Sequence, residues 1–157
     1  MPRHSYKKRV FKKDKLFDSI EVAKLINYIM INGKKSVAEG LVYKVMDELK
    51  KQSDEPLKLL HLAIENVAPI HEVKARRLGG ASYLVPTEVR RERKLKLALN
   101  WIIDAAKART NKEYHTFDKK LFVEIVEASK NQGAAIAKKL QTEKLAEANK
   151  AFSHLKW

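Results

Sequence analysis

Basic side chains gather in two short segments of the chain, and their type suits the binding of phosphate groups. Residues 1–15 carry seven lysines and arginines against one acidic residue, and residues 71–96 carry eight against three. Seven of the eight arginines lie in these segments, and Arg109 lies outside them. A guanidinium group can bind two phosphate oxygens at once, whereas an ammonium group acts as a point charge. This placement of arginine favours a phosphate-rich partner over a surface that is merely solvated.

The second segment also contains residue types that are suited to contact nucleic acid. Lys74, Arg76 and Arg77 precede the pair Gly79-Gly80, and Tyr83 follows it. Basic side chains beside a glycine turn let the backbone approach a phosphate chain, and a tyrosine ring can stack on a base. The alternative is a solvated hairpin in which Tyr83 packs on the body of the protein. We expect the segment to contact nucleic acid, while both roles of Tyr83 stay open.

Residues 32–36 resemble half of a phosphate-binding loop, but they lack its earlier glycine and its preceding strand. A turn between two helices is the simpler interpretation. Lys34 and Lys35 of this turn, with the free N–H groups of the next helix, could still meet an RNA phosphate.

The sequence does not contain a recognisable catalytic or metal-binding set. The absence of cysteine excludes a disulfide framework, a Cys-ligated zinc site and a thiol nucleophile. No two histidines have the spacing of a helical metal pair; they are His4, His61, His71, His115 and His154. Carboxylates are expected on solvent-facing surfaces or at helix caps, for example Asp47, Glu48, Glu124 and Glu127. We therefore expect no enzyme activity, no metal and no cofactor.

Length and composition are typical of one soluble domain over residues 1–157. The chain has 157 residues, 45% of them hydrophobic, with a net charge of +14 and a pI near 9.9. It can therefore bury a core, and its charge points to a polyanionic partner. No run of 18 apolar residues is present, so no membrane span is expected.

Hydrophobic spacing predicts three helices before the second basic segment. The first begins at Asp18, which forms a capping box with Glu21, and ends at Asn32-Gly33. The second has Ser36 and Glu39 as its capping box. The third is opened by Pro56 and stopped by Pro69.

Residues 70–90 then read as a β-hairpin arm, because β-prone residues flank Gly79-Gly80. Three more helices follow. The last is expected over residues 134–152, with four residues facing inward: Ile136, Leu140, Ala148 and Phe152. The expected fold class is mainly α: a six-helix bundle with a protruding two-stranded β-hairpin arm and a basic N-terminal tail at residues 1–15.

Several motifs resemble those of one protein family. The chain opens with Met1-Pro2-Arg3, and residues 29–36 read IMINGKKS. Residues 72–80 read EVKARRLGG, residues 85–90 read VPTEVR, and residues 146–154 read AEANKAFSH. In this order and spacing they closely resemble the bacterial form of small-subunit ribosomal protein seven. The likeness covers essentially the whole chain.

The resemblance implies a structural constituent of the small ribosomal subunit, in the cytoplasm. It implies a primary rRNA-binding protein that nucleates assembly of the subunit head on the 3′ domain of the small-subunit rRNA. It places the arm near the exit-site tRNA and the mRNA path, and ribosomal proteins nine and eleven nearby. Neither membrane association nor a homo-oligomer is expected.

The resemblance also carries roles onto residues of this sequence. Ribosomal RNA is expected to contact the basic residues of the tail, the turn and the arm base: Arg3, Lys7, Lys8, Arg9, Lys12, Lys13, Lys34, Lys35, Lys74, Arg76, Arg77, Arg90, Arg91, Arg93 and Lys94. The arm tip and the C-terminal end are expected to face tRNA and mRNA: Leu78, Gly79, Gly80, Ala81, Ser82, Tyr83, His154, Lys156 and Trp157.

Two other classes compete with this interpretation. An architectural double-stranded DNA-binding protein would use a basic β-arm equally well on grounds of charge. An RNA-modifying enzyme would need a cofactor loop or a catalytic set, which the sequence does not show. The motifs decide in favour of ribosomal RNA.

Overall fold

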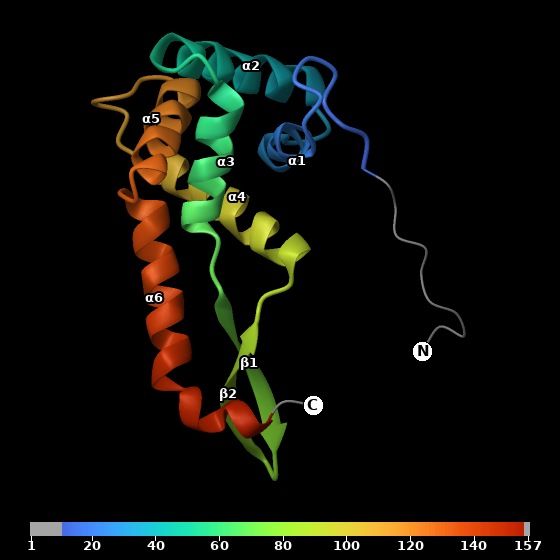
Figure 1. The fold of residues 1–157 in the computed structure, drawn as a ribbon, viewed down its shortest axis with the longest axis vertical. Helices are drawn as coiled ribbons and strands as arrows, with labels where there is room; N and C mark the ends of the chain where they lie inside the picture. Colours follow the sequence, from blue (N-terminus) through green and yellow to red (C-terminus); the bar gives the residue numbers. More distant parts are fainter. Residues whose placement is uncertain (1–10, 156–157) are drawn as a thin grey trace.

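The computed structural model describes residues 11–155, which form a helical body with a long hairpin extending from it (Figure 1). The elements in chain order are α1 (Ile20–Ile29), α2 (Lys35–Gln52), α3 (Pro56–Val67), β1 (His71–Leu78), β2 (Ala81–Glu88), α4 (Arg91–Ala108), α5 (Phe117–Ser129), α6 (Ala134–Ala148) and the 3-10 helix η1 (Lys150–Leu155). This confirms the mainly α fold class with one two-stranded arm. Every helix in the described range is too short or too polar to cross a bilayer.

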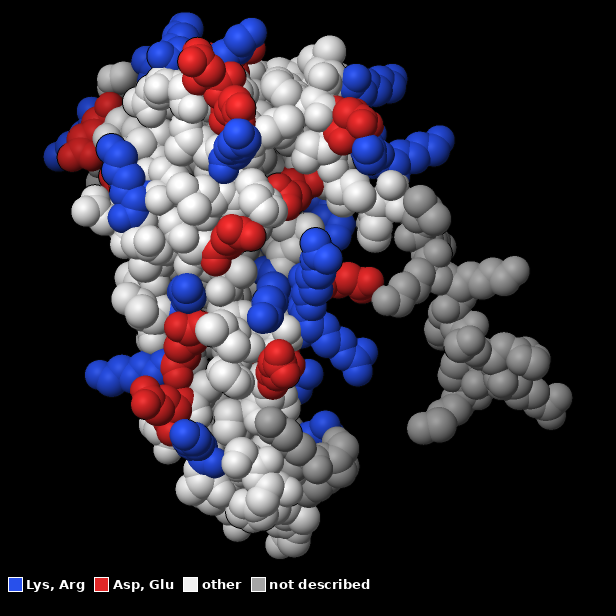
Figure 2. All heavy atoms as spheres, viewed as in Figure 1, with Lys and Arg blue, Asp and Glu red and all other residues white. Residues whose placement is uncertain are grey.

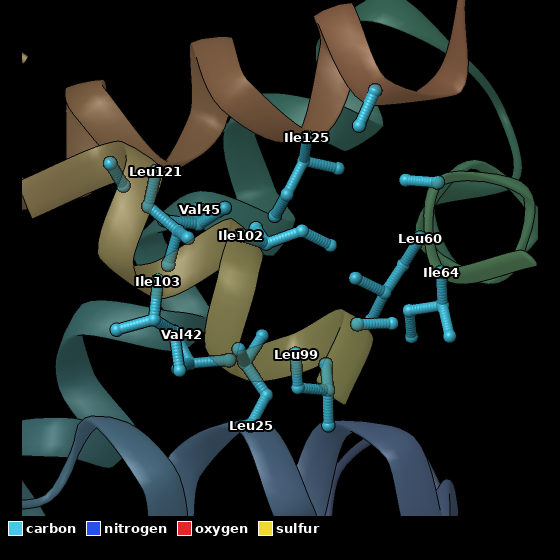
Figure 3. Packing of buried hydrophobic residues seen from close by; sticks show 14 of the residues in the cluster. Leu25, Val42, Val45, Leu60, Ile64, Leu99, Ile102, Ile103, Leu121 and Ile125 are labelled. Carbon is cyan, nitrogen blue, oxygen red and sulfur yellow. The ribbon is translucent and has the colours of Figure 1, made fainter. Parts of the chain in front are cut away.

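The core lies mainly among helices α1, α2, α3, α4 and α5, and the start of α6 adds Ala135 and Ile136 to it (Figure 3). Leu25 of α1, Val42 of α2 and Leu60 of α3 are fully buried. Leu99 of α4 and Ile125 of α5 are buried to the same extent. Each such side chain stabilises the fold by about 1.5–3 kcal/mol relative to an exposed one. The helices therefore form because apolar residues three and four positions apart share one face.

Two of the predicted helix starts were wrong by one or two residues. The cap of α1 is Ser19, whose Oγ accepts the N–H of Glu21 at 3.2 Å. Asp18 lies in the left-handed region, with φ 48°, whereas an N-cap residue takes extended backbone angles. At α2 the cap is Lys34, which makes no side-chain capping bond, so Ser36 lies inside the first turn. The predicted start of α3 at Pro56 is confirmed.

The arm is an antiparallel hairpin that begins directly after α3 and ends directly before α4. Its ladder runs from the pair His71–Glu88 to the pair Leu78–Ala81. Gly79 and Gly80 join the strands with φ of 54° and 91°. A two-residue turn with positive φ at both positions matches the right-handed twist of the strands, and glycine adopts it without steric cost. The hairpin predicted from these glycines is therefore confirmed.

Helix α6 leaves the helical body and runs along the arm (Figure 1). Its first turns bury Ala135 and Ile136, and near its end Ala146 is buried again. Leu140 and Ala148 are exposed, so their predicted inward orientation was wrong. Helix α6 packs against the helical body and the arm, and Leu140 and Ala148 lie on the part of its surface that neither covers.

Helix α6 also ends earlier than predicted. The side-chain amide of Asn149 donates to the carbonyl of Leu145 at 2.8 Å, at the C-cap position. The chain then tightens into η1, which contacts β2. The C-terminal part of the described chain therefore crosses the arm instead of extending the long helix.

Candidate nucleic-acid interface

The base of the arm is joined to the start of α4 through one buried carboxylate. Glu72 on β1 has 6% of its surface exposed. The Nε of Arg93, in the first turn of α4, lies 2.7 Å from both carboxylate oxygens of Glu72. The Nζ of Lys74 lies 3.4 Å from the same carboxylate. Glu72 therefore holds two of the basic side chains that were predicted to bind RNA.

The other predicted basic residues of this region lie at the start of α4 and along β1. We call the group at the joint the arm-base cluster: Lys74, Arg90, Arg91, Arg93 and Lys94. The predicted place of Arg76 and Arg77 at the arm base was wrong, because they pair with Tyr83 and Ser82 and so lie near the tip. Arg77, Arg90 and Arg91 are exposed, while Arg76 and Lys94 are half-buried. Figure 2 shows basic side chains gathered beside the start of α4 and the upper part of the arm. The hairpin thus brings together two stretches of sequence that lie on either side of the glycine turn.

The predicted turn lysines lie at a different helix start. Lys34 is the N-cap of α2, and Lys35 is its first residue. The Nζ of Lys35 lies 3.6 Å from Glu39, and both lysines are exposed. The first N–H groups of a helix carry a partial positive charge, which attracts anions. This turn and the arm-base cluster therefore each combine basic side chains with a helix N-terminus.

The base of the N-terminal tail is also part of the described structure. Lys12 and Lys13 are exposed, and the Nζ of Lys13 lies 2.8 Å from Asp18. The ammonium of Lys24 on α1 lies 4.9 Å from the centre of the Phe11 ring, a cation–π contact. The remaining tail residues with a predicted RNA contact lie outside the described residues: Arg3, Lys7, Lys8 and Arg9.

The tip of the arm is exposed on one side and covered at Tyr83. The exposed residues are Leu78, Gly79, Gly80, Ala81 and Ser82. The ring of Tyr83 lies 5.3 Å from that of Phe152 in η1, tilted by 54°. Of the two roles left open for Tyr83, packing on the protein is the one that the structure contains. The ring face toward Phe152 is occupied.

Of the predicted C-terminal contacts, the structure describes His154, which lies in η1. His154 is exposed, and its Nδ1 lies 2.9 Å from the carbonyl of Ala151. Lys156 and Trp157 lie outside the described residues.

Sequence reasoning missed a buried ionic network at the far end of α4. Glu124 on α5, expected at a cap or on the solvent side, is fully buried. Arg109 donates to its Oε2 from Nε at 2.9 Å and from Nη2 at 2.6 Å, and also donates to Glu127. The Oε1 of Glu124 accepts the N–H of Ala135 at 3.0 Å, in the first turn of α6. The network therefore ties together the ends of three helices.

The two carboxylates favour the charged form of the Arg109 guanidinium. Burial lowers the pKa of Arg109, but hydrogen bonds to Glu127 and Glu124 outweigh it and raise the pKa above its ordinary value. The Nζ of Lys120 donates to the carbonyl of Arg109 at 2.5 Å and to Asn111 at 2.6 Å. The sequence held one clue: Arg109 is the arginine that stands apart from both basic segments.

No group of three or more acidic or histidine side chains within residues 11–155 could hold a metal ion. The geometry instead defines a class of protein: a helical body that presents clustered arginines and a basic hairpin arm to a polyanion. Such proteins bind nucleic acid through phosphate contacts.

Comparison with known proteins gives the family. The family model described as ribosomal protein S7p/S5e matches residues 1–150. A small ribosomal subunit protein uS7 of Bordetella petrii is 47% identical over 159 residues, covering 100% of both chains. One of Acidiphilium cryptum is 46% identical over 158 residues, covering 99% of this chain and 98% of its own.

The chain belongs to the ribosomal protein S7p/S5e family. Proteins of this family are structural and non-enzymatic RNA-binding components of the small ribosomal subunit, which in bacteria is cytoplasmic. The expectation of a non-enzymatic ribosomal protein is therefore confirmed by the family.

Proposed function

We propose that the chain is a structural component of the small ribosomal subunit that binds the 3′ domain of the small-subunit rRNA directly. Binding this domain before other proteins would nucleate assembly of the subunit head. The arm tip then lies near the exit-site tRNA and the mRNA path, with ribosomal proteins nine and eleven as neighbours.

The observation that carries the proposal is the arm-base cluster. Five basic side chains, from β1 and from the start of α4, meet at one joint, and Arg90 and Arg91 are exposed there. A-form RNA is recognised mainly through its shape, phosphates and 2′-hydroxyls. A rigid joint with several guanidinium groups suits such recognition, because their spacing is set before RNA arrives.

Equilibrium binding to a transcript of the rRNA 3′ domain tests the proposal. The wild type is compared with Arg90→Ala/Arg91→Ala over a series of salt concentrations, with duplex DNA as competitor. Both arginines are exposed, and Arg93 is left in place because it holds Glu72. Lys50→Ala/Lys51→Ala is the matched control, since it removes two exposed charges at the end of α2.

The wild-type protein is expected to bind the transcript without other ribosomal proteins, even when competitor DNA is in excess. The arginine variant is expected to bind more weakly, with a salt slope reduced by about two. The lysine control should bind like the wild type. Equal affinity for RNA and DNA would instead favour the architectural DNA-binding alternative. Binding that needs other ribosomal proteins would overturn the nucleating role.

The position of the arm tip is tested separately. The chain has no cysteine, so Ser82→Cys introduces a unique attachment point for a photo-crosslinker at the exposed tip. In reconstituted subunits carrying mRNA and exit-site tRNA, this position is expected to crosslink to one of them. Gln52→Cys, exposed at the end of α2, is the control. Equal crosslinking from both positions would contradict the proposed location of the tip.

A further inference from the structure

Asp14 is buried in a part of the chain that is otherwise exposed. It is the one acidic residue among residues 1–15, and 8% of its surface is exposed. Its Oδ2 accepts the N–H groups of Leu16 at 3.0 Å and Phe17 at 3.1 Å. Its Oδ1 accepts the hydroxyl of Tyr43 at 2.9 Å. The carboxylate is therefore used inside the fold and does not offset the positive charge at the surface.

The backbone closes a loop around this carboxylate. The N–H of Asp14 donates to the carbonyl of Ser19, and the N–H of Asp18 donates to the carbonyl of Asp14, both at 3.1 Å. The ion pair between Lys13 and Asp18 lies across the same loop. Residues 14–19 therefore form a closed turn at the place where the basic tail meets α1.

Tyr43 fastens this turn to the helical body. It belongs to α2, 29 residues further along the chain, and its ring lies 6.1 Å from that of Phe17. Burial, together with the hydrogen bond to the Asp14 carboxylate, raises the pKa of Tyr43 to about 12. The hydroxyl therefore remains a proton donor to Asp14 throughout the physiological range.

The contact is local to the exit point of the tail. Lys12 and Lys13 directly precede Asp14, and four more basic residues precede them in the sequence: Arg3, Lys7, Lys8 and Arg9. A charged segment that leaves a fold from a fixed point, in a fixed direction, loses less freedom when it binds. A tail joined through a loose hinge would bind the same phosphates more weakly.

We propose that the Asp14–Tyr43 hydrogen bond is a positioning contact that directs the basic tail toward RNA. It acts through the tail and does not itself touch the RNA. The inference rests on the proposed rRNA-binding function and adds a residue pair in which neither side chain is basic.

A double-mutant cycle tests the inference in the full-length chain. Tyr43→Phe removes the hydroxyl and keeps the ring. It is made in the wild type and in a chain with four substitutions in the tail: Arg3→Gln, Lys7→Gln, Lys8→Gln and Arg9→Gln. Tyr28→Phe is the matched control, because Tyr28 also packs on the core while its hydroxyl makes no hydrogen bond within residues 11–155. All are titrated with the 3′-domain transcript, in excess duplex DNA, over a salt series.

Tyr43→Phe is expected to raise the Kd about 3- to 10-fold and to reduce the salt slope by about one. The same change in the chain with the four substitutions should alter the Kd less than about twofold, because the basic side chains of residues 3–9 are no longer there to be directed. Tyr28→Phe should bind like the wild type. Asp14→Ala should resemble Tyr43→Phe, whereas Asp14→Asn, which keeps an oxygen acceptor, should recover most of the affinity. Thermal melting confirms that each variant is folded at the assay temperature.

An equal loss in both backgrounds would overturn the inference, since the contact would then act through the fold and not through the tail. Unchanged binding by Tyr43→Phe in a wild-type background that still prefers RNA would overturn the inference and leave the proposed function standing. A wild type without preference for RNA over DNA would overturn both.

Discussion

Arg93 and Glu72 form an ion pair across the base of the arm, with Nε 2.7 Å from both carboxylate oxygens. The two residues are 21 positions apart, and nearly all of the hairpin lies between them. The Glu72 side chain is 8% exposed, whereas that of Arg93 is 50% exposed. The pair therefore joins the arm to α4 through the nearly buried carboxylate of Glu72. It also explains why an acidic residue stands within the most basic part of the fold.

Glu72→Gln is expected to destabilise the protein by about 1–3 kcal/mol, because it weakens charged hydrogen bonds at a buried site. Urea denaturation measures this loss, and amide exchange in β1 and β2 should become faster. Glu88→Gln, which removes an exposed carboxylate at the end of β2, is the control and should stay within about 0.5 kcal/mol of wild type. Equal losses in the two variants would contradict the role of the Glu72–Arg93 pair.

Glu124→Ala is expected to destabilise the protein by about 3–5 kcal/mol. The change leaves the largely buried guanidinium of Arg109 without one of its two carboxylate partners and removes the acceptor of the Ala135 N–H. Thermal or urea unfolding provides the measurement. Glu113→Ala, in the exposed loop after α4, is the matched control. A loss below about 1 kcal/mol would show that water or another side chain replaces Glu124 at little cost.

Two Gly→Ala substitutions are expected to have opposite effects. A Cβ at Gly133 would lie 3.0 Å from Oε1 of Glu124, and the backbone there has φ 96°. Gly133→Ala should therefore destabilise the protein by more than about 1 kcal/mol. Gly40 lies inside α2, and a Cβ there meets nothing within 4 Å. Gly40→Ala should stabilise the protein by about 0.5–1 kcal/mol. Effects of the same sign in chemical denaturation would refute this pair of predictions.

Because of the Tyr43 hydroxyl, the free energy of unfolding is expected to change with pH in the alkaline range. The folded chain holds its proton up to a pKa of about 12, whereas an unfolded tyrosine loses it near the ordinary value of 10. The stabilisation is therefore fully present below pH 10 and is lost as the pH rises toward 12. The free energies of unfolding of wild type and Tyr43→Phe should differ by about 1–2 kcal/mol at pH 8. Their difference should shrink at pH 11. A difference that stays constant would show that the Tyr43 hydroxyl does not link stability to pH.

Local rules in the sequence predict several elements correctly. The start of α3 at Pro56 and the hairpin at Gly79-Gly80 depend on backbone preferences of one or two residues. The start of α1 was misplaced because Asp18 and Ser19 are both good caps. The choice between them depends on the turn that Asp14 closes, which is a tertiary feature in part, since Tyr43 holds it.

The buried carboxylates could not be placed from sequence, because their partners are distant in the chain. From sequence alone, Glu124 is expected to face solvent on α5. In the fold it is paired with Arg109, which lies 15 positions earlier. The sequence likewise places Asp14 in the basic tail, and its contact with Tyr43 forms only in the folded protein. Burial of a charge is favourable only when a partner compensates its desolvation, and the fold decides where that partner lies.

The sequence by itself determined the helical periodicity, the hairpin, the concentration of arginine and, through its motifs, the family. These depend on residue types and short spacings that the folding of the remaining chain does not alter. Tertiary structure decided which basic side chains meet at the arm base, which of them are engaged by Glu72, and which face of Tyr83 is covered by Phe152. Those outcomes depend on contacts between elements, because electrostatic and packing energies are set by distance in space and not by distance along the chain.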